Sequence, residues 1–137
     1  MAMNILQPPG WAKPKGFSNG IAVKGGTTVF VAGQIAFNSE NVIQEKTFAR
    51  QFRQTLKNTV AVLAEAGAKP EHIVRMTWYI TDKKEYLGAI KDVGAAYREL
   101  IGRHYPAMAV VQVVALMEDE AKVEIETTAV VPEGKSA

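Results

Sequence analysis

The spacing of apolar residues changes several times along this chain, and this change restricts the fold more than any other feature. Between Thr47 and Gly67 apolar side chains recur every three or four positions, as on one face of a helix, and the same spacing returns between Asp82 and Gly102. The run Ile73–Ile80 between them is rich in β-branched and aromatic residues, which is typical of a buried strand. With the flanking segments, the predicted order is strand, strand, short strand, helix, strand, helix, strand, strand. This order predicts an α+β fold in which two helices pack on one face of a mixed sheet.

Local signals mark where both predicted helices begin and end. Thr47 is placed to cap the first helix, and the glycine and proline of residues 67–70 end it. Asp82 and Glu85 have the spacing of a capping box at the start of the second helix, which Gly102 ends. The apolar stripes are Phe48, Phe52, Leu56, Val60 and Leu63 in the first helix and Tyr86, Ile90, Val93, Tyr97 and Leu100 in the second.

The residues before the first helix predict short strands. Residues 21–23 and 28–31 flank the glycines Gly25 and Gly26, which predicts a β-hairpin, and residues 34–37 add a short extended piece. The residues up to Lys15 are rich in proline and predict an irregular arm on the surface.

The C-terminal part predicts two more strands. They follow a bend at Tyr105 and Pro106 and are joined, as in a hairpin, by the acidic turn at residues 118–120. In the second strand, Val123, Ile125, Thr127 and Ala129 share one face, and Lys122, Glu124, Glu126 and Thr128 share the other. Two carboxylates on one sheet face suggest a functional site.

Length and composition fit one globular domain over residues 1–137. The chain has 47% hydrophobic and 22% charged residues, which is enough to bury a proper core. No segment is apolar for long enough to span a membrane, no apolar signal core opens the chain and cysteine is absent, so we expect a cytoplasmic protein. The formal net charge of +2, without a basic run, argues against a nucleic-acid binder. With two histidines and no metal-binding motif, we expect neither a metal nor another cofactor.

Two helices can cover only one face of the predicted sheet. The other face would carry side chains that are too apolar to leave in water. These side chains, or their neighbours along the same strands, are Thr77, Tyr79, Met108, Val110, Val114 and Val130. We therefore expect a second copy of the chain to bury this face.

Several segments resemble the reactive intermediate deaminase (Rid, YjgF-type, endoribonuclease L-PSP-like) family in order and spacing. They are Gly16-Phe17-Ser18-Asn19-Gly20, Ala32-Gly33-Gln34-Ile35, Leu63-Ala64-Glu65-Ala66-Gly67, Ile73-Val74-Arg75, Tyr97, Pro106-Ala107-Met108 and Lys122-Val123-Glu124-Ile125-Glu126. Together they extend over nearly the whole chain. The resemblance implies a chorismate-mutase-like α+β fold, assembled as a homotrimer with a ligand cleft between each pair of subunits.

The resemblance also implies a chemistry, the hydrolysis of enamines and imines such as aminoacrylate to ammonia and a keto acid. The implied site consists of Phe17, the backbone at Gly33, Gly94, Met108, the backbone of Val110, and Glu124. Glu124 alone keeps the family's side-chain chemistry. The family's tyrosine is Phe17 here, its asparagine is Gly94, and the arginine that grips the substrate carboxylate is Met108. The chain therefore resembles an arginine-lacking branch, similar to aminomuconate deaminases, and we do not expect the usual aminoacrylate specificity.

The two carboxylates have different interpretations. Glu124 could position the attacking water or take its proton as a general base, or it could be an ordinary strand carboxylate. Glu126, on the same face, fits better as a structural partner of Arg75 or Lys122.

Other polar residues near the predicted cleft are also open to two interpretations. Arg103 and His104 could supply the positive charge that Met108 cannot, or they could interact with the dipole of the preceding helix. Gln112 could bind a ligand or make a cross-strand hydrogen bond. Trp78 fits better as a packing residue than as a stacking platform.

Three functions are compatible with these residues. The first is an enamine or imine deaminase-like hydrolase that acts on a small reactive intermediate between subunits. The alternative is a catalytically silent module that binds a small ligand or a protein on the same fold. A ribonuclease has little support, because the chain has no basic cluster and no matched pair of acid-base histidines.

Overall fold

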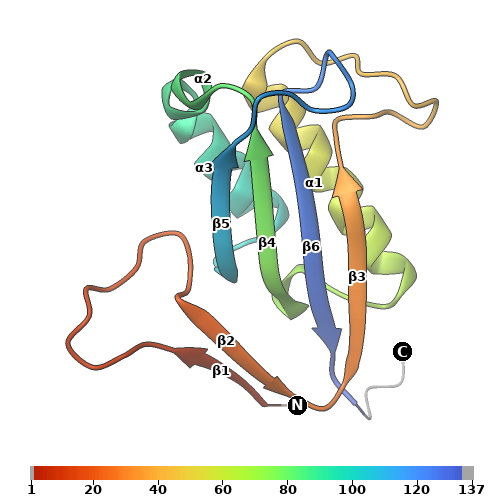
Figure 1. Ribbon diagram of the computed structural model, residues 1–137. Coiled ribbons are helices and arrows are strands. Elements are labelled where there is room, and N and C mark those ends of the chain that lie inside the picture. The colour runs from red at the N-terminus through yellow and green to blue at the C-terminus, as the bar shows by residue number, and fades with distance from the viewer. Residues whose placement is uncertain (1, 134–137) are drawn as a thin grey trace.

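The computed structural model describes residues 2–133 as one layer of helices on a sheet, with a small separate strand pair (Figure 1). The elements in chain order are β1 (Ala2–Leu6), β2 (Gly20–Lys24), β3 (Thr27–Gln34), α1 (Phe48–Glu65), the 3-10 turn η1 (Pro70–His72), β4 (Ile73–Ile80), α2 (Lys83–Gly88), α3 (Ile90–Leu100), β5 (Ala107–Gln112) and β6 (Val123–Val131).

Four strands form a mixed sheet in the order β3-β6-β4-β5, and the helices cover one of its faces (Figure 1). Strand β6 is antiparallel to both β3 and β4, whereas β4 and β5 are parallel and are connected through α2 and α3. The predicted α+β class is therefore confirmed. The predicted hairpin of the last two strands is wrong, because the connection at residues 113–122 carries the chain across the sheet and β6 inserts between β3 and β4.

The hairpin predicted around Gly25 and Gly26 is also wrong. Strand β2 pairs with β1 in a separate two-stranded sheet, while β3 pairs with β6, so the predicted irregular arm is in part a strand. Gly25 and Gly26 have positive φ angles of 76° and 84°, and a Cβ on Gly26 would lie 2.5 Å from the carbonyl oxygen of Val131. The glycine pair thus turns the chain from one sheet to the other, and the space at Gly26 admits only a residue without a side chain.

The hydrophobic core lies between the helices and the sheet. Phe52 and Leu56 of α1 belong to one buried cluster with Trp78 of β4 and Ile125 of β6. The Phe52 ring packs edge-on against Trp78, with ring centroids 4.7 Å apart. As predicted, α1 begins after Thr47, whose hydroxyl accepts a hydrogen bond from a backbone N–H of the first turn.

The second predicted helix is in fact two helices, α2 and α3, separated at Ala89. The φ of −103° and ψ of 9° at Ala89 interrupt the helical path. Asp82 caps α2 as predicted, because its carboxylate accepts hydrogen bonds from the N–H groups of Lys84 and Glu85 at 2.9 and 3.1 Å. The Glu85 carboxylate forms an ion pair with Lys122, 3.0 Å away, and so connects α2 to the segment that leads into β6.

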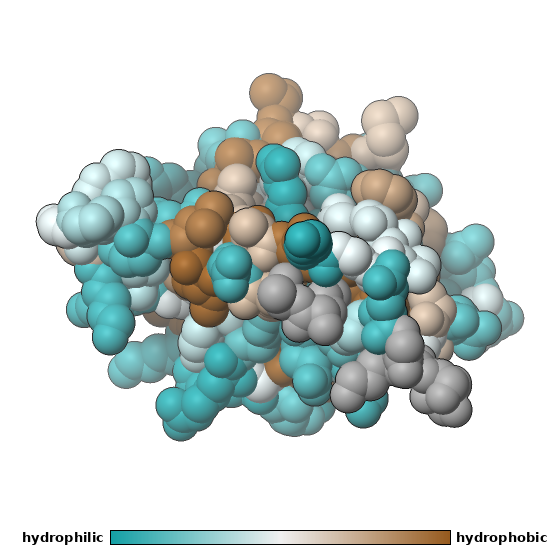
Figure 2. All heavy atoms as spheres, turned by 90° about the horizontal axis from the view of Figure 1, so that it is seen from below, coloured by the Kyte–Doolittle hydropathy of each residue, from teal (hydrophilic) through white to brown (hydrophobic). Residues whose placement is uncertain are grey.

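The face of the sheet opposite the helices is not covered by residues 2–133. Thr77 and Tyr79 lie on this open face, as predicted, beside Phe30, which is 80% exposed. Met108 and Val110 lie on the helix side instead, because they pair in register with residues of β4 that point into the core. Figure 2, a view from below, shows hydrophobic residues exposed at the surface among hydrophilic ones.

Candidate functional site

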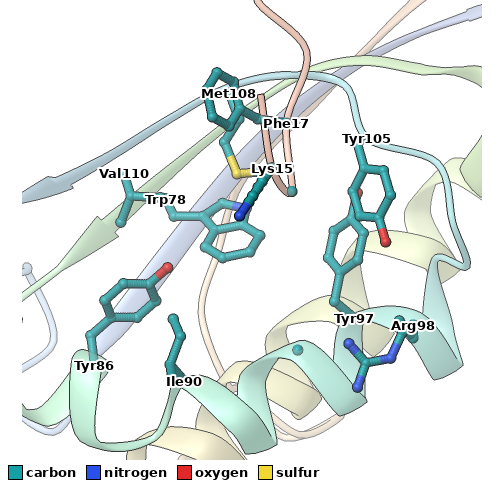
Figure 3. Close-up of a pocket in the computed structure, with 12 residues that line it drawn as sticks. Lys15, Phe17, Trp78, Tyr86, Ile90, Tyr97, Arg98, Tyr105, Met108 and Val110 are labelled. Atoms are coloured by element: carbon teal, nitrogen blue, oxygen red, sulfur yellow. The ribbon is translucent and has the colours of Figure 1, made fainter. Parts of the chain in front are cut away.

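The main cavity of the described residues has a volume of about 600 Å³ and lies between the β5 edge of the sheet and the helices α2 and α3 (Figure 3). Six parts of the chain contribute to it: the segment before β2, strand β4, the helices α2 and α3, the loop before β5 and β5 itself. The lining residues are Lys15, Gly16, Phe17, Trp78, Tyr86, Ile90, Gly94, Tyr97, Arg98, Tyr105, Met108 and Val110.

Phe17 reaches this cavity because the neighbouring Ser18 is tied to the start of β5. The backbone N–H of Ser18 donates to the carbonyl oxygen of Pro106 at 3.0 Å, and its hydroxyl donates to the carbonyl oxygen of Tyr105 at 2.5 Å. Ser18 is buried, so both bonds are protected from water. Residues 16–20, one of the segments that carry the family resemblance, are thereby held beside the start of β5.

Met108 and Val110 enter the cavity from the helix side of β5. The strand register places Met108 beside Met76 and Val110 beside Trp78. Gln112 lies on the same side of β5, but its side-chain amide oxygen Oε1 accepts a hydrogen bond from the backbone N–H of Lys83 at 2.7 Å. Gln112 therefore satisfies a free N–H at the start of α2 and is not among the lining residues.

Glu124 and Gly33 lie together on the open face, across the sheet from the cavity. A Cβ built on Gly33 would overlap the Glu124 carboxylate, so the absence of a side chain at position 33 lets the carboxylate rest against the backbone of β3. Glu126, also on this face, accepts a hydrogen bond from the Tyr79 hydroxyl at 2.7 Å, and this bond raises the pKa of Tyr79. Glu126 is thus bound to a neighbouring side chain, whereas Glu124 faces the space above Gly33.

Arg103 and His104 lie outside the cavity lining. A ring nitrogen of His104 lies 2.6 Å from the carbonyl oxygen of Ile73, and the backbone carbonyl of His104 accepts a hydrogen bond from the Tyr97 hydroxyl at 2.5 Å. Arg103 is exposed on the loop before β5. His104 therefore joins α3 and β4 to this loop, and neither residue lines the cavity with Met108.

Several lining residues with polar groups were not predicted as site residues, among them Arg98 and Trp78. Arg98 follows Gly94 by one helical turn on α3, and its guanidinium nitrogen Nη1 lies 3.3 Å from the place where a Cβ of Gly94 would be. Trp78 is 5% exposed, and its indole nitrogen has no hydrogen-bond partner among the described residues. The sequence signal for Arg98 was its i, i+4 spacing from Gly94.

No group of three or more His, Cys, Asp or Glu side chains in residues 2–133 is arranged to hold a metal ion. None of the helices in the same range is both long and apolar enough to cross a bilayer.

Comparison with protein-family models matches residues 12–131 to the family described as Endoribonuclease L-PSP. The chain belongs to this family, which includes the Rid and YjgF proteins. A RutC family protein of Synechocystis sp. (strain ATCC 27184 / PCC 6803 / Kazusa) is 33% identical over 135 residues and is matched over 96% of this chain and 99% of its own length. The 2-iminobutanoate/2-iminopropanoate deaminase of Escherichia coli (strain K12) is 32% identical over 108 residues, which cover 77% of this chain and 80% of that protein.

Solved structures of Rid and YjgF proteins share the fold. The conserved Rid family protein YyfB from Yersinia pestis superposes with a TM-score of 0.82 at 32% identity, covering 96% of this chain and 100% of that one. The YjgF gene product of Escherichia coli superposes with a TM-score of 0.65 at 32% identity, covering 83% and 87% of the two chains. The predicted family and the predicted fold class are both confirmed.

Proposed function

We propose that this Rid-family protein is an enamine or imine deaminase-like hydrolase that acts on a small reactive intermediate between the subunits of a homotrimer. Two observations support the proposal at the family level: the family match over residues 12–131 and the similarity to an iminobutanoate and iminopropanoate deaminase. Glu124 is the residue to which we assign the catalytic role.

The observation that carries the proposal is the division of the implied site between two sides of the sheet. Phe17, Gly94, Met108 and Val110 line or border the cavity on the helix side, whereas Glu124 lies on the open face. One chain therefore cannot bring the carboxylate to the cavity. A second copy that packs its open face against the β5 edge of its neighbour would add its own Glu124 to the neighbour's cavity and complete the site.

In this arrangement, the reaction is a hydrolysis in which Glu124 acts as the general base. An enamine first gains a proton on carbon and becomes an imine. Glu124 then removes a proton from water as the water oxygen attacks the imine carbon and the nitrogen becomes protonated. Glu124 gives the proton that it took from water to the amino nitrogen of the resulting carbinolamine, and the carbon–nitrogen bond breaks so that ammonia leaves. Loss of the hydroxyl proton to solvent gives the carbonyl product.

The side chains at positions 17, 94 and 108 favour a larger and flatter substrate than a three- or four-carbon imino acid. Met108 has no fixed donors for a carboxylate, and a charge-assisted hydrogen bond of that kind contributes about 1.5 to 3 kcal/mol. Methionine and phenylalanine instead offer a soft, apolar contact surface. An aminomuconate-like compound is a suitable first substrate to test.

The test compares Glu124→Gln with the control Glu126→Gln on the same strand and the same face. Ammonia release from aminomuconate-like compounds and from freshly generated imino acids would be measured with purified protein. We expect Glu124→Gln to lower the rate of the best substrate by about a hundredfold or more, the usual contribution of a general base, and Glu126→Gln to retain most of it. Equal rates for wild type and Glu124→Gln would falsify the assignment of Glu124.

A second candidate function is a silent binding module that keeps the cavity without the chemistry. The replacement of three side chains of the family's site by Phe17, Gly94 and Met108, with a cavity of about 600 Å³ retained, favours it. Such a module would bind a ligand of the same kind, measured by calorimetry, and release no ammonia from any compound in the screen.

A further inference from the structure

The cavity contains a buried hydrogen-bond donor without an acceptor. Trp78 is 5% exposed, and its indole N–H finds no partner among residues 2–133. Its ring packs against Phe52 and lies 6.0 Å from the ring of Tyr97, measured between centroids, so neighbours of the indole supply aromatic carbon and not an acceptor atom. Because buried donors in folded proteins are nearly always paired, this N–H points to an acceptor on a molecule that enters the cavity.

A guanidinium group lies at the same cavity without a carboxylate partner. Arg98 extends along α3 over Gly94, with Nη1 3.3 Å from the position of a Cβ on that glycine. Any longer side chain at position 94 would compete with Arg98 for this space. In the part of the chain that the structure describes, Arg98 has no carboxylate within 4.0 Å, in contrast to Arg53, which is paired with Glu99.

The charges around the cavity are of one sign. Lys15 and Arg98 are the charged residues of the lining within residues 2–133, and no aspartate or glutamate accompanies them. A cavity with two cations and no anion attracts a negatively charged ligand. The planar fork of an arginine is suited to bind a carboxylate through two parallel hydrogen bonds.

The walls of the cavity are aromatic and suited to a flat molecule. Figure 3 shows Trp78 and Tyr86 on one side, Tyr97 and Tyr105 on the other, and Arg98 next to Tyr97. The rings of Tyr97 and Tyr105 are stacked, 5.8 Å apart and inclined by 10°. A volume of about 600 Å³ is in the range that holds a drug-sized ligand and exceeds what a three- or four-carbon acid needs.

We propose that this cavity selects a planar, conjugated carboxylate, whose carboxylate group is bound by Arg98 and whose second acceptor receives the indole N–H of Trp78. This inference rests on the proposed function for its chemical setting, because the ligand would be an unsaturated or aromatic imino acid. Arg98 then supplies, from α3, the cation that is absent at position 108 of β5.

The test measures binding, which does not depend on deamination. Cinnamate serves as the planar carboxylate, cinnamamide as its neutral counterpart, and pyruvate as the small acid, with calorimetry on wild type, Arg98→Met and Arg103→Met. Arg103 is a matched control, since it is an exposed arginine near the same strand but outside the cavity. We expect wild type to bind cinnamate more tightly than cinnamamide or pyruvate, and Arg98→Met alone to weaken cinnamate about ten- to a hundredfold.

A second measurement reports on Trp78 without changing the core. In protein labelled with nitrogen-15, the indole N–H signal of Trp78 should move downfield when cinnamate is added, and Trp11→Phe identifies which of the two indole signals belongs to Trp78. Equal binding of cinnamate by wild type and Arg98→Met, or equal binding of acid and amide, would overturn the proposal. If Glu124→Gln leaves ammonia release unchanged while these binding differences hold, the proposed mechanism fails and the ligand selectivity stands.

Discussion

The hydroxyl of Tyr97 connects the helix layer to the loop that leads into β5. Tyr97 is buried on α3, and its hydroxyl donates to the backbone carbonyl of His104 at 2.5 Å, while its ring stacks on Tyr105. Burial, with a smaller contribution from Tyr105, raises the pKa of the Tyr97 phenol well above its usual range. Folding therefore both forms this hydrogen bond and keeps the Tyr97 phenol protonated.

This arrangement predicts a loss of stability in alkaline solution. In the unfolded chain the phenol of Tyr97 ionises near pH 10, whereas in the folded protein it stays protonated to a higher pH, so the free energy of unfolding falls as the pH rises above about 10. Tyr97→Phe should lower the free energy of unfolding by about 1 kcal/mol at neutral pH and remove this part of the alkaline slope. Urea titrations between about pH 7 and 11 measure both. Parallel curves for the two proteins above pH 10 would contradict the assignment.

At the residue scale, the sequence predicted which residues are candidates for the site better than it predicted what their side chains contact. Glu124, Met108 and Phe17 were found from local motifs, because a motif reflects the residues next to one another in the chain. Arg98 was missed although it follows Gly94 by one helical turn, because that spacing does not show that α3 lies across the cavity from β5. The side of the sheet on which Met108 lies could not be predicted either, because an apolar strand can present either set of alternate residues to the core.

At the element scale, the buried face of α1 is less apolar than its stripe of large residues suggested. Gln51, Thr55 and Thr59 are also buried on this face, and both threonine hydroxyls donate to backbone carbonyls one turn earlier. The Gln51 side chain donates to the carbonyl oxygens of Glu45 and Glu120 at 3.1 and 2.9 Å, and accepts from the N–H of residue 122 at 2.8 Å. One side chain thus joins α1 to the loop before it and to the loop before β6.

Replacing Gln51 should therefore lower the free energy of unfolding much more than replacing another glutamine of the same helix. Gln51→Leu removes three hydrogen bonds and leaves backbone groups without partners, so we expect a loss of about 3 kcal/mol in the free energy of unfolding. Gln54→Leu is the matched control, because the side chain of Gln54 on the same helix forms a hydrogen bond only with the side chain of Asn58. This variant should lower the free energy of unfolding by less than about 1 kcal/mol. Urea unfolding measures both variants. Similar losses for the two would show that Gln51 is not the connection between α1 and the loops.

The elements themselves were largely predictable, whereas their pairing was not. The start of α1 at Thr47, the strand Ile73–Ile80 and the alternation of β6 follow from caps and periods that act over a few residues. Both predicted hairpins failed because neighbours in sequence were assumed to be neighbours in the sheet. Strand β6 instead pairs with β3 and β4 in the interior of the sheet. There both of its edges form backbone hydrogen bonds, whereas at the edge of the sheet one row of N–H and C=O groups would stay unpaired.

At the scale of the whole molecule, the open face of the sheet exposes apolar side chains that a partner would bury. Phe30 is 80% and Val111 is 41% exposed, and a hollow of about 550 Å³ lies between Phe30, Arg75 and Glu126 on the same face. A proposed homotrimer would bury these apolar side chains and would also bring Glu124 to a neighbouring cavity.

This assembly can be tested by mass in solution. Wild type should sediment near 45 kDa, three times the chain mass of 14.9 kDa. Phe30→Glu places a charge on the open face and should shift the mass toward that of a single chain. Val62→Glu is the control, because Val62 is 39% exposed on α1, in the helix layer away from the open face, and this variant should keep the wild-type mass. A wild-type protein that sediments as a single chain would exclude the assembly.

The central position of β6 has a consequence for the growing chain. Strands β3 and β4 both leave the ribosome before β6, so each lacks its antiparallel neighbour until residues 123–131 have been synthesised. Until then two strand edges and the apolar side of α1 are exposed together, a combination that favours association with other chains. Folding of the four-stranded sheet must therefore follow the translation of β6, and the nascent protein is most prone to association before that point.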